Sequence, residues 1–226
     1  MSILVKKINK HFIFYDKDIG INIEELFLKN NFHQEQVFKT GIINNGKWFL
    51  KHYVRKGLMK FFGDRYLNTS IKKTRPYLEF FLLNDLYKKK FPTCKPIMGW
   101  ITKDKYTYRA NLISEYIPSV DLKTYIEKNM MNDNDWYLIG ALVSSLHRLN
   151  IFHGDLNITN ILVNDSSKNN EKFALVDFDK SKNKDYLTVK EKSSNIDRIL
   201  RSLKKNNLYN KNGFDLLIKG YSFTND

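Results

Sequence analysis

The chain has 226 residues, which is the length of one domain with two lobes or of two small domains. Hydrophobic residues make up 42% and aromatic residues 14%, a composition that excludes a wholly disordered chain. The single cysteine, Cys94, excludes a disulfide framework and a cysteine-based zinc site, and it fits a reducing compartment. A net charge of +14 points to an anionic partner, such as nucleic acid, a membrane surface or a phosphorylated substrate. A coding bias toward lysine explains the charge equally well, because only seven of the 38 basic residues are arginine.

The sequence shows no targeting or membrane-spanning segment. Its N-terminus lacks the apolar core of a signal peptide. The longest uncharged stretch, 136–146, is far shorter than the ~20 apolar residues that span a bilayer. We therefore expect a cytosolic protein that contacts a membrane, if at all, only peripherally.

The first half of the chain is rich in predicted strands. Strands are predicted at 37–43 and 47–54, joined by the turn Asn44-Asn45-Gly46. A helix is predicted from Thr74 to Lys88-Lys89-Lys90, with Thr74 as its cap and Pro76 in its first turn. Its predicted apolar stripe consists of Leu78, Phe81, Leu82 and Leu86. Two more strands are predicted at 99–102 and 106–116.

Helices dominate the second half, after a break at Pro118. Short strands are predicted at 161–163 and 173–176. Helices are predicted at 121–128, 134–149, 194–205 and 213–219. The second of these helices carries an apolar face of Trp136, Ile139, Val143 and Leu146. A strand-rich first half and a helix-rich second half predict a two-lobed α+β enzyme, with the lobe boundary at 115–119.

One constellation carries recognisable chemistry. The stretch His153-Gly154-Asp155-Leu156-Asn157-Ile158-Thr159-Asn160 follows a predicted helix, and Asp177 ends a predicted strand 22 residues after Asp155. An Asp-x4-Asn pair followed by a strand-end Asp is the arrangement that phosphoryl transfer from ATP requires. Asp155 would receive the proton of the acceptor hydroxyl, while Asn160 and Asp177 would hold Mg²⁺. We expect His153 to hold the loop in place and not to act as a base.

The first half supplies the remaining parts of a nucleotide site. Lys51 lies in the second hairpin strand, where a kinase places the lysine that contacts the ATP phosphates. Glu79, on the following helix, would pair with Lys51. The segment 39–46 has only two glycines and makes a weak glycine-rich loop. Glu115 and Ile117 would form the hinge that meets adenine, a placement that rests on chain order alone.

Over residues 46–204 the chain resembles the 3-deoxy-D-manno-octulosonic acid (Kdo) kinases of lipopolysaccharide inner-core synthesis, which belong to the protein-kinase-like superfamily. The most specific stretches that carry the resemblance are Arg65-Tyr66-Leu67, Asp177-Phe178-Asp179 and the late segment Asn195-Ile196-Asp197-Arg198-Ile199-Leu200-Arg201-Ser202-Leu203. The resemblance implies one kinase-like domain, with an antiparallel-sheet N-lobe of about 1–116, a hinge of about 115–119 and a mainly helical C-lobe of about 119–226. It implies the cofactors ATP and Mg²⁺, and phosphorylation of the 4-hydroxyl of Kdo on a lipid A precursor at the cytoplasmic side of the inner membrane.

Three departures from the protein-kinase pattern bear on the acceptor. Asp179 replaces the usual glycine, and Asn157 stands where protein kinases carry a lysine. Only 47 residues follow Asp179, too few for a long activation segment. The lack of room for an activation segment argues against a docked protein substrate and for a small or glycolipid acceptor.

Two other hypotheses remain open. A small atypical protein kinase or ATPase, like the one in the tRNA threonylcarbamoyladenosine complex, would use the positive charge to bind RNA. That family normally keeps Asp-Phe-Gly, which this chain lacks. A non-catalytic pseudokinase is disfavoured because Lys51, Glu79, Asp155, Asn160 and Asp177 are all retained. For the favoured glycolipid kinase we expect no nucleic-acid partner and no obligate protein partner.

A last segment suggests how such an enzyme would reach a lipid-anchored sugar. Residues 55–65 interleave four cations with the apolar residues Leu58, Met59, Phe61 and Phe62. Apolar residues that enter a membrane interface and cations that meet anionic headgroups are the ingredients of peripheral membrane binding. The alternative is that the four apolar side chains simply pack on the small lobe.

Overall fold

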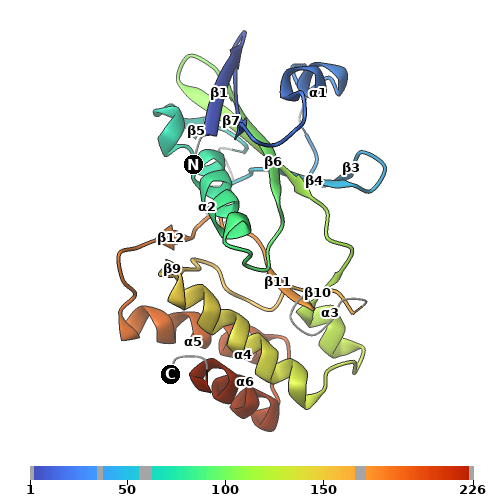
Figure 1. The fold of residues 1–226 in the computed structure, drawn as a ribbon, viewed down its shortest axis with the longest axis vertical. Coiled ribbons are helices and arrows are strands. Elements are labelled where there is room, and N and C mark those ends of the chain that lie inside the picture. Colours follow the sequence, from blue (N-terminus) through green and yellow to red (C-terminus); the bar gives the residue numbers. More distant parts are fainter. Residues whose placement is uncertain (1–2, 35–37, 56–62, 166–171, 224–226) are drawn as a thin grey trace. The chain divides into compact units, whose positions relative to one another are not determined.

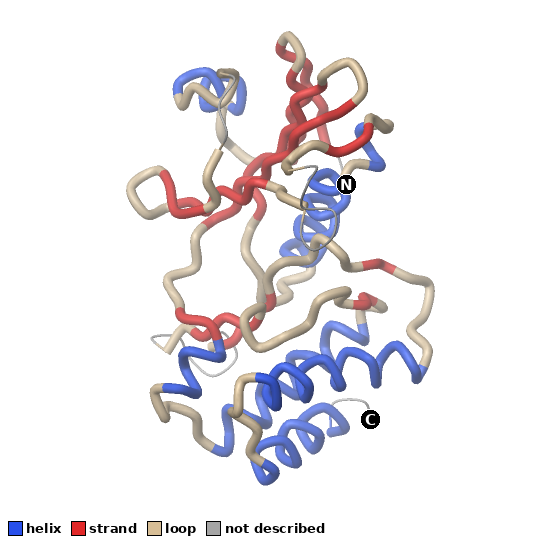
Figure 2. Tube along the Cα trace, turned by 180° about the vertical axis from the view of Figure 1, so that it is seen from behind, coloured by secondary structure: helices blue, strands red, loops and turns tan. Residues whose placement is uncertain are grey.

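The chain forms two units in a computed structural model that describes residues 3–34, 38–55, 63–165 and 172–223 (Figure 1). The first unit comprises Met1–Asp85 and Lys95–Tyr116, and the second comprises Leu86–Cys94 and Ile117–Asp226. Strands prevail in the first unit and helices in the second, as the colouring of Figure 2 shows. The α+β fold class predicted from the sequence is confirmed.

The first unit is built on an antiparallel sheet in the order β1-β2-β6-β7-β4-β3, with the short β5 also paired to β7. Its strands are β1 (Ile3–Ile8), β2 (His11–Asp16), β3 (Gly41–Ile43), β4 (Trp48–His52), β5 (Tyr66–Leu67), β6 (Pro96–Lys103) and β7 (Thr107–Glu115). Its helices are α1 (Ile23–Lys29) and α2 (Arg75–Lys88), and a 3₁₀ turn, η2 (Ile71–Lys73), precedes α2. The sequence pattern gave no prediction for β1, β2 or α1.

The predicted hairpin of the first unit is confirmed. Ile42 of β3 pairs with Phe49 of β4, and Asn44 and Asn45 of the turn both have φ of 52°. Two consecutive residues with positive φ form the turn type that suits the right-handed twist of paired strands, and asparagine tolerates that conformation. On its other side β4 pairs with β7, and this pairing sets Lys51 opposite Leu112 within the sheet.

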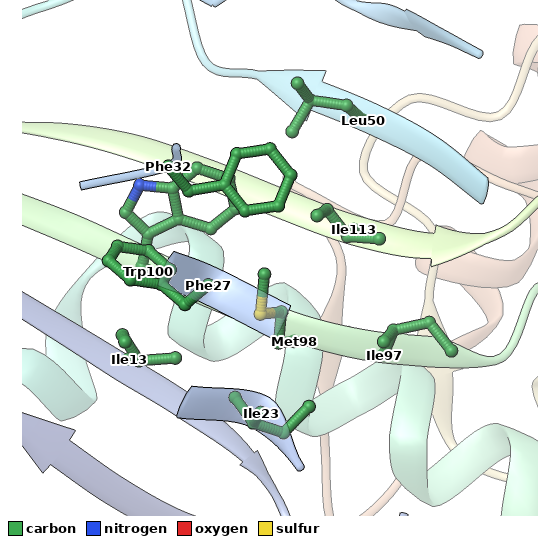
Figure 3. Packing of buried hydrophobic residues seen from close by; sticks show 9 residues of the cluster. All are labelled: Ile13, Ile23, Phe27, Phe32, Leu50, Ile97, Met98, Trp100 and Ile113. Atoms are coloured by element: carbon green, nitrogen blue, oxygen red, sulfur yellow. The ribbon is translucent and has the colours of Figure 1, made fainter. Parts of the chain in front are cut away.

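One face of the sheet carries the aromatic core drawn in Figure 3. Trp100 of β6 lies opposite Ile13 of β2, stacks on Phe32 and meets the edge of Phe27 from α1 (Figure 3). The other residues of this cluster are Ile23, Leu50, Ile97, Met98 and Ile113. Aromatic side chains bury large apolar areas, so this cluster contributes much of the stability of the unit.

Helix α2 covers the opposite face, and its predicted apolar stripe is confirmed at Leu82 and Leu86 but wrong at Leu78 and Phe81. Tyr77 and Phe80 pack edge-on against Phe14 of β2. Leu78 and Phe81, assigned to the predicted stripe, are 54% and 43% exposed. The buried apolar side chains of the helix are Tyr77, Phe80, Leu82, Leu83 and Leu86. Apolar residues occur on the exposed side of the helix as well as on its buried side, so the periodicity did not define a single face.

The described residues of the second unit pack four helices with a three-stranded sheet, in the order β11-β10-β8, and a two-stranded sheet of β12 and β9. The helices are α3 (Leu122–Glu127), α4 (Asp133–Arg148), α5 (Val189–Lys205) and α6 (Lys211–Phe223). The strands are β8 (Val120–Asp121), β9 (Ile151–Phe152), β10 (Ile161–Val163), β11 (Phe173–Leu175) and β12 (Lys182–Asn183). The predicted apolar face of α4 is confirmed, because Trp136, Ile139, Val143 and Leu146 are all buried. Helix α5 begins five residues earlier than predicted, where Thr188 and Glu191 form a capping box.

Glycines let α4 and α6 approach closely. A Cβ atom on Gly140 of α4 would lie 1.9 Å from the carbonyl oxygen of Leu217. A Cβ atom on Gly220 of α6 would lie 2.0 Å from the carbonyl oxygen of Tyr137. Each glycine therefore admits the main chain of the partner helix where any side chain would collide with it.

Most of the segment proposed for membrane docking, residues 56–62, lies outside the described residues. Its described flanks are held together, because the Arg55 N–H donates to the carbonyl of Gly63 at 2.9 Å and the Arg55 side chain donates to the carbonyl of Arg65. Asp64 contacts Arg109 at 3.0 Å and His52 at 3.2 Å, so this part of the Asp64-Arg65-Tyr66-Leu67 stretch has a structural role.

Candidate active site

In the first unit, Lys51 of β4 and Glu79 of α2 form an ion pair. The Lys51 ammonium lies 2.8 Å from Oε1 and 2.7 Å from Oε2 of Glu79. Glu79 is only 2% exposed, whereas the Lys51 side chain is 22% exposed. A carboxylate this deeply buried requires a charged or hydrogen-bonding partner, and Lys51 provides one. The structure thus brings together the two residues that the sequence paired.

Tyr53 is a third member of this cluster, and the sequence analysis missed it. Its side chain is 2% exposed, and its hydroxyl donates a hydrogen bond to Oε2 of Glu79. The Lys51 ammonium lies 4.9 Å from the centre of the Tyr53 ring, and the Arg75 guanidinium lies 5.8 Å from it. Tyr53 therefore holds Glu79 by a charge-assisted bond and both cations by its ring face. The sequence held one signal for Tyr53: it lies two residues after Lys51, and residues two apart in an extended chain point to the same side.

In the second unit, His153 is a fully buried, neutral member of the loop that carries Asp155. Its Nδ1 accepts the main-chain N–H of Asp155 at 3.2 Å, so Nε2 carries the hydrogen and donates to the carbonyl of Val176 at 3.1 Å. Burial lowers the pKa of His153 to about 4. As expected from the sequence, this histidine holds the loop in place.

Asn195 of α5 fixes the same loop from the other side. Its Oδ1 accepts the main-chain N–H of His153 at 3.1 Å, and its Nδ2 donates to the carbonyl of His153 at 2.7 Å. The same Oδ1 accepts from Nε2 of His147, whose Nδ1 in turn accepts the hydroxyl of Tyr221. Helices α4, α5 and α6 are thus joined to the loop by one buried hydrogen-bond network.

Asp155 lies between two cations that the sequence analysis did not assign. Its side chain is 39% exposed. The Lys180 ammonium lies 3.1 Å from Oδ2, and the Arg198 Nη1 lies 3.9 Å from Oδ1. The carboxylate is therefore accessible to a reactant and has a positive charge on each side.

Asn160 and Asp177 belong to segments that hydrogen-bond to each other. The Asn160 amide donates from Nδ2 to the carbonyl of Asp155 at 2.8 Å, which leaves Oδ1 as the atom that a metal would meet. The carbonyl of Asn160 accepts the N–H of Val176 at 3.0 Å, so Asp177 is the next residue after the one bound to Asn160. Asp177 itself has φ of 63°, in the left-handed region. Strain of this kind in a non-glycine residue is typical of functional sites.

The two remaining predicted positions lie where the chain passes between units. Glu115 ends β7, where its N–H donates to the carbonyl of Lys95 at 2.8 Å and its side chain contacts Lys95 at 3.4 Å. Ile117 is in the second unit, and its carbonyl accepts the hydroxyl of Ser119.

Asn157 braces the Asp155 loop, because its Nδ2 donates to the carbonyl of Asp155 and its Oδ1 accepts the N–H of Thr159.

Comparison with known proteins gives a consistent family. A family model described as "Lipopolysaccharide kinase (Kdo/WaaP) family" matches residues 30–221. A 3-deoxy-D-manno-octulosonic acid kinase of Mannheimia succiniciproducens is 36% identical over 215 residues, which cover 86% of this chain and 87% of the relative. A protein of the same name from Haemophilus influenzae is 34% identical over 218 residues, covering 87% and 88% of the two chains. These matches do not favour the tRNA-complex alternative.

A solved structure shares the fold. WaaP, solved in complex with acyl carrier protein, superposes with a TM-score of 0.54 over 98% of this chain and 78% of its own, at 11% identity. Identity this low shows the fold alone, and it confirms the kinase-like fold predicted from the sequence. Among the described residues, none of the helices is both long and apolar enough to cross a bilayer.

Proposed function

Because the chain belongs to the lipopolysaccharide kinase (Kdo/WaaP) family, we propose that it transfers the γ-phosphoryl group of ATP to the 4-hydroxyl of Kdo on a lipid A precursor, in synthesis of the lipopolysaccharide inner core. The acceptor is the one in the names of relatives that match along nearly their whole length. The accessible Asp155 carboxylate, held on a loop by buried hydrogen bonds, is the observation that carries the chemical part of the proposal.

In the proposed reaction Asp155 accepts the proton of the acceptor hydroxyl. The hydroxyl oxygen forms a bond to the γ-phosphorus while the bond from that phosphorus to the β,γ-bridging oxygen breaks, and ADP leaves. Phosphoryl transfer depends mainly on positioning and electrostatic stabilisation. The Asn195 and His153 contacts supply that positioning, because they fix the main chain on which Asp155 stands.

Asn160 and Asp177 fit a Mg²⁺ site. Both offer oxygen atoms, which Mg²⁺ prefers, and Asp177 directly follows Val176, whose N–H is bound to the carbonyl of Asn160. Magnesium usually takes only one or two protein ligands and completes its shell with water and phosphate oxygens, so these two residues suffice. When bound, the metal would neutralise charge on the phosphates.

Lys51, held by Glu79, would contact the α- and β-phosphates, and the main chain at Glu115 and Ile117 would meet adenine. We place the N-lobe at about 1–116, the hinge at about 115–119 and the C-lobe at about 119–226. The buried Lys51–Glu79 pair supports the first assignment, since a kinase needs this pair in place. The hinge assignment is supported by chain order.

Mass spectrometry of Kdo-lipid A after incubation with the protein and Mg-ATP tests this function. A mass gain of one phosphate on the Kdo residue is expected, with ADP formed in equal amount. Incubations without Mg²⁺, and with Asp155→Asn in place of the wild type, are the controls. Absence of phosphorylated Kdo with active, ATP-binding protein would contradict the proposed acceptor.

We also propose peripheral contact with the cytoplasmic face of the inner membrane through residues 55–65. The support is the composition of the segment and the two hydrogen bonds that Arg55 donates, to the carbonyls of Gly63 and Arg65. Each cation near an anionic surface is worth about 1 kcal/mol. Replacing Lys56 and Lys60 by Glu should weaken binding to anionic liposomes at low salt and leave ATP affinity unchanged. Liposome binding that survives this double substitution would contradict the docking role.

A further inference from the structure

We propose that Arg198 of α5 binds the carboxylate of the acceptor sugar and so orients its hydroxyl toward Asp155. This inference rests on the proposed function, because it concerns how the same site recognises a sugar acid. No motif used above assigns an acceptor-binding residue. Arg198 belongs instead to the late segment 195–203, which distinguishes this chain from ordinary kinases.

The first observation is the state of the Arg198 guanidinium. Its Nε is buried and makes no hydrogen bond with any described residue. Its closest described carboxylate is Asp155, whose Oδ1 lies 3.9 Å from Nη1, beyond hydrogen-bond distance. A buried donor on a charged group is costly when it stays unsatisfied. The guanidinium, on a side chain that is 36% exposed, therefore keeps hydrogen-bonding capacity that the described residues leave unused.

The second observation is the chemistry of the ligand that would supply it. Kdo is a sugar acid, so one ring carries both the hydroxyl to be phosphorylated and a carboxylate. Guanidinium binds a carboxylate through two parallel N–H···O bonds, with one geometry, and thus fixes orientation as well as affinity. Because Arg198 lies beside the carboxylate proposed as base, a sugar acid bound to it would lie at the reacting position.

The third observation separates Arg198 from Lys180. Lys180 meets the other oxygen of Asp155, at 3.1 Å, and its side chain is 61% exposed against 36% for Arg198. A flexible, hydrated ammonium gives little orientation. Arg198 is also set in a rigid helix one turn from Ser202, whose hydroxyl accepts the N–H of Ile158 in the Asp155 loop. The arginine therefore has a fixed position relative to Asp155.

Steady-state kinetics of Arg198→Gln and Arg198→Lys test this role, with Arg201→Gln as the matched control. Arg201 is an exposed arginine on the same helix. Arg198→Gln should raise KM for Kdo-lipid A about tenfold to a hundredfold, the loss expected when a charge-assisted pair is removed. Arg198→Lys should raise the KM for Kdo-lipid A less than Arg198→Gln does. In both variants the KM for ATP should change less than threefold. Arg201→Gln should leave both KM values unchanged.

A second acceptor identifies the carboxylate as the group that is bound. The second acceptor is Kdo-lipid A whose Kdo carboxylate has been reduced to an alcohol. The KM of the wild type for this acceptor should rise by the same factor, and the KM of Arg198→Gln should rise little further. If Arg198→Gln raises the KM for ATP as much as the KM for the acceptor, Arg198 binds the phosphates and the inference is overturned. An equal effect of Arg201→Gln, or an unchanged acceptor KM in Arg198→Gln, would also overturn it. If wild type fails to phosphorylate Kdo-lipid A, the proposed function itself fails.

Discussion

The side-chain amide of Asn195 donates a hydrogen bond to the main-chain carbonyl of His153 at 2.7 Å, and both residues are fully buried. The amide oxygen of Asn195 also accepts the main-chain N–H of His153. One side chain thus satisfies both main-chain polar groups of the residue that begins the Asp155 loop. A helix 40 residues further along the chain thereby sets the position of the loop.

Asn195→Ala should destabilise the protein and slow catalysis. The substitution leaves polar groups of His153 and His147 buried without partners, and each such group costs about 1–3 kcal/mol. We expect the free energy of unfolding in urea to fall by about 2–4 kcal/mol. Turnover should fall at temperatures where the variant remains folded. Lys190→Ala, an exposed change on the same helix, is the control and should shift stability by less than about 0.5 kcal/mol.

The buried His153 predicts a loss of stability in mild acid. An unfolded histidine has a pKa near 6.5, whereas burial lowers the pKa of His153 to about 4 in the folded protein. Between these values the unfolded state binds more protons, so stability falls as pH falls from about 6.5 toward 4, by up to about 3 kcal/mol. Urea unfolding at pH 6.5 and pH 5 measures the slope.

His153→Gln removes this titration and serves as the comparison. Its unfolding free energy should depend less on pH between 6.5 and 5 than that of wild type, even though its absolute stability is lower. Burial also lowers the pKa of His147, but that contribution remains in both proteins and cancels. Equal slopes in the two proteins would show that His153 titrates normally when folded.

Tyr53→Phe tests whether the tyrosine hydroxyl fixes the Lys51–Glu79 pair. The variant keeps the ring and removes the donor to Oε2 of the buried Glu79. We expect a loss of about 1–2 kcal/mol in unfolding free energy and a higher KM for ATP, because Lys51 is held less firmly. Tyr106→Phe, at an exposed tyrosine in the same unit, should change neither quantity. Unchanged ATP kinetics in Tyr53→Phe would limit this residue to a packing role.

Asp155→Asn and Asp177→Asn should fail in different ways. Asp155→Asn removes the proposed base with little change of volume, so turnover should fall about 10²-fold or more while Mg-ATP binding is kept. Asp177→Asn should weaken ATP binding in the presence of Mg²⁺ and leave metal-free binding unchanged, which calorimetry can measure. Near-normal turnover in Asp155→Asn would refute the assignment of the base.

The sequence could predict the parts of the site that depend on short spacings. The Asp155–Asn160 spacing, the strand-end Asp177 and the Asn44-Asn45-Gly46 turn are local patterns with a direct structural meaning. In the structure the carbonyl of Asn160 binds the N–H of Val176, the residue before Asp177. The Lys51–Glu79 pair was predicted over 28 residues only because a strand and the next helix have a regular order in this fold. The assignment of chemical roles to these residues stays a prediction.

Other features could not be predicted because they depend on contacts between distant segments. Asn195 and Arg198 lie 40 and 43 residues after Asp155. The family resemblance marked their segment, but no sequence pattern indicated which residues of the Asp155 loop they contact. The apolar stripe of α2 was half right because apolar residues occupy both of its sides: Phe81 is exposed although Phe80 is buried. Burial of Glu79 beside Tyr53 was equally hidden, since an isolated glutamate in a helix normally faces solvent.

The close approach of α4 and α6 sets a limit on protein engineering. In an ordinary helix, replacing an interior glycine with alanine gains about 1 kcal/mol, so Gly140 and Gly220 look like easy targets for thermostabilisation. Here a single methyl group at either position would overlap a main-chain carbonyl of the other helix and force the two apart. A stabilising library should therefore leave both glycines fixed and vary exposed positions such as Val189, which is 81% exposed at the start of α5.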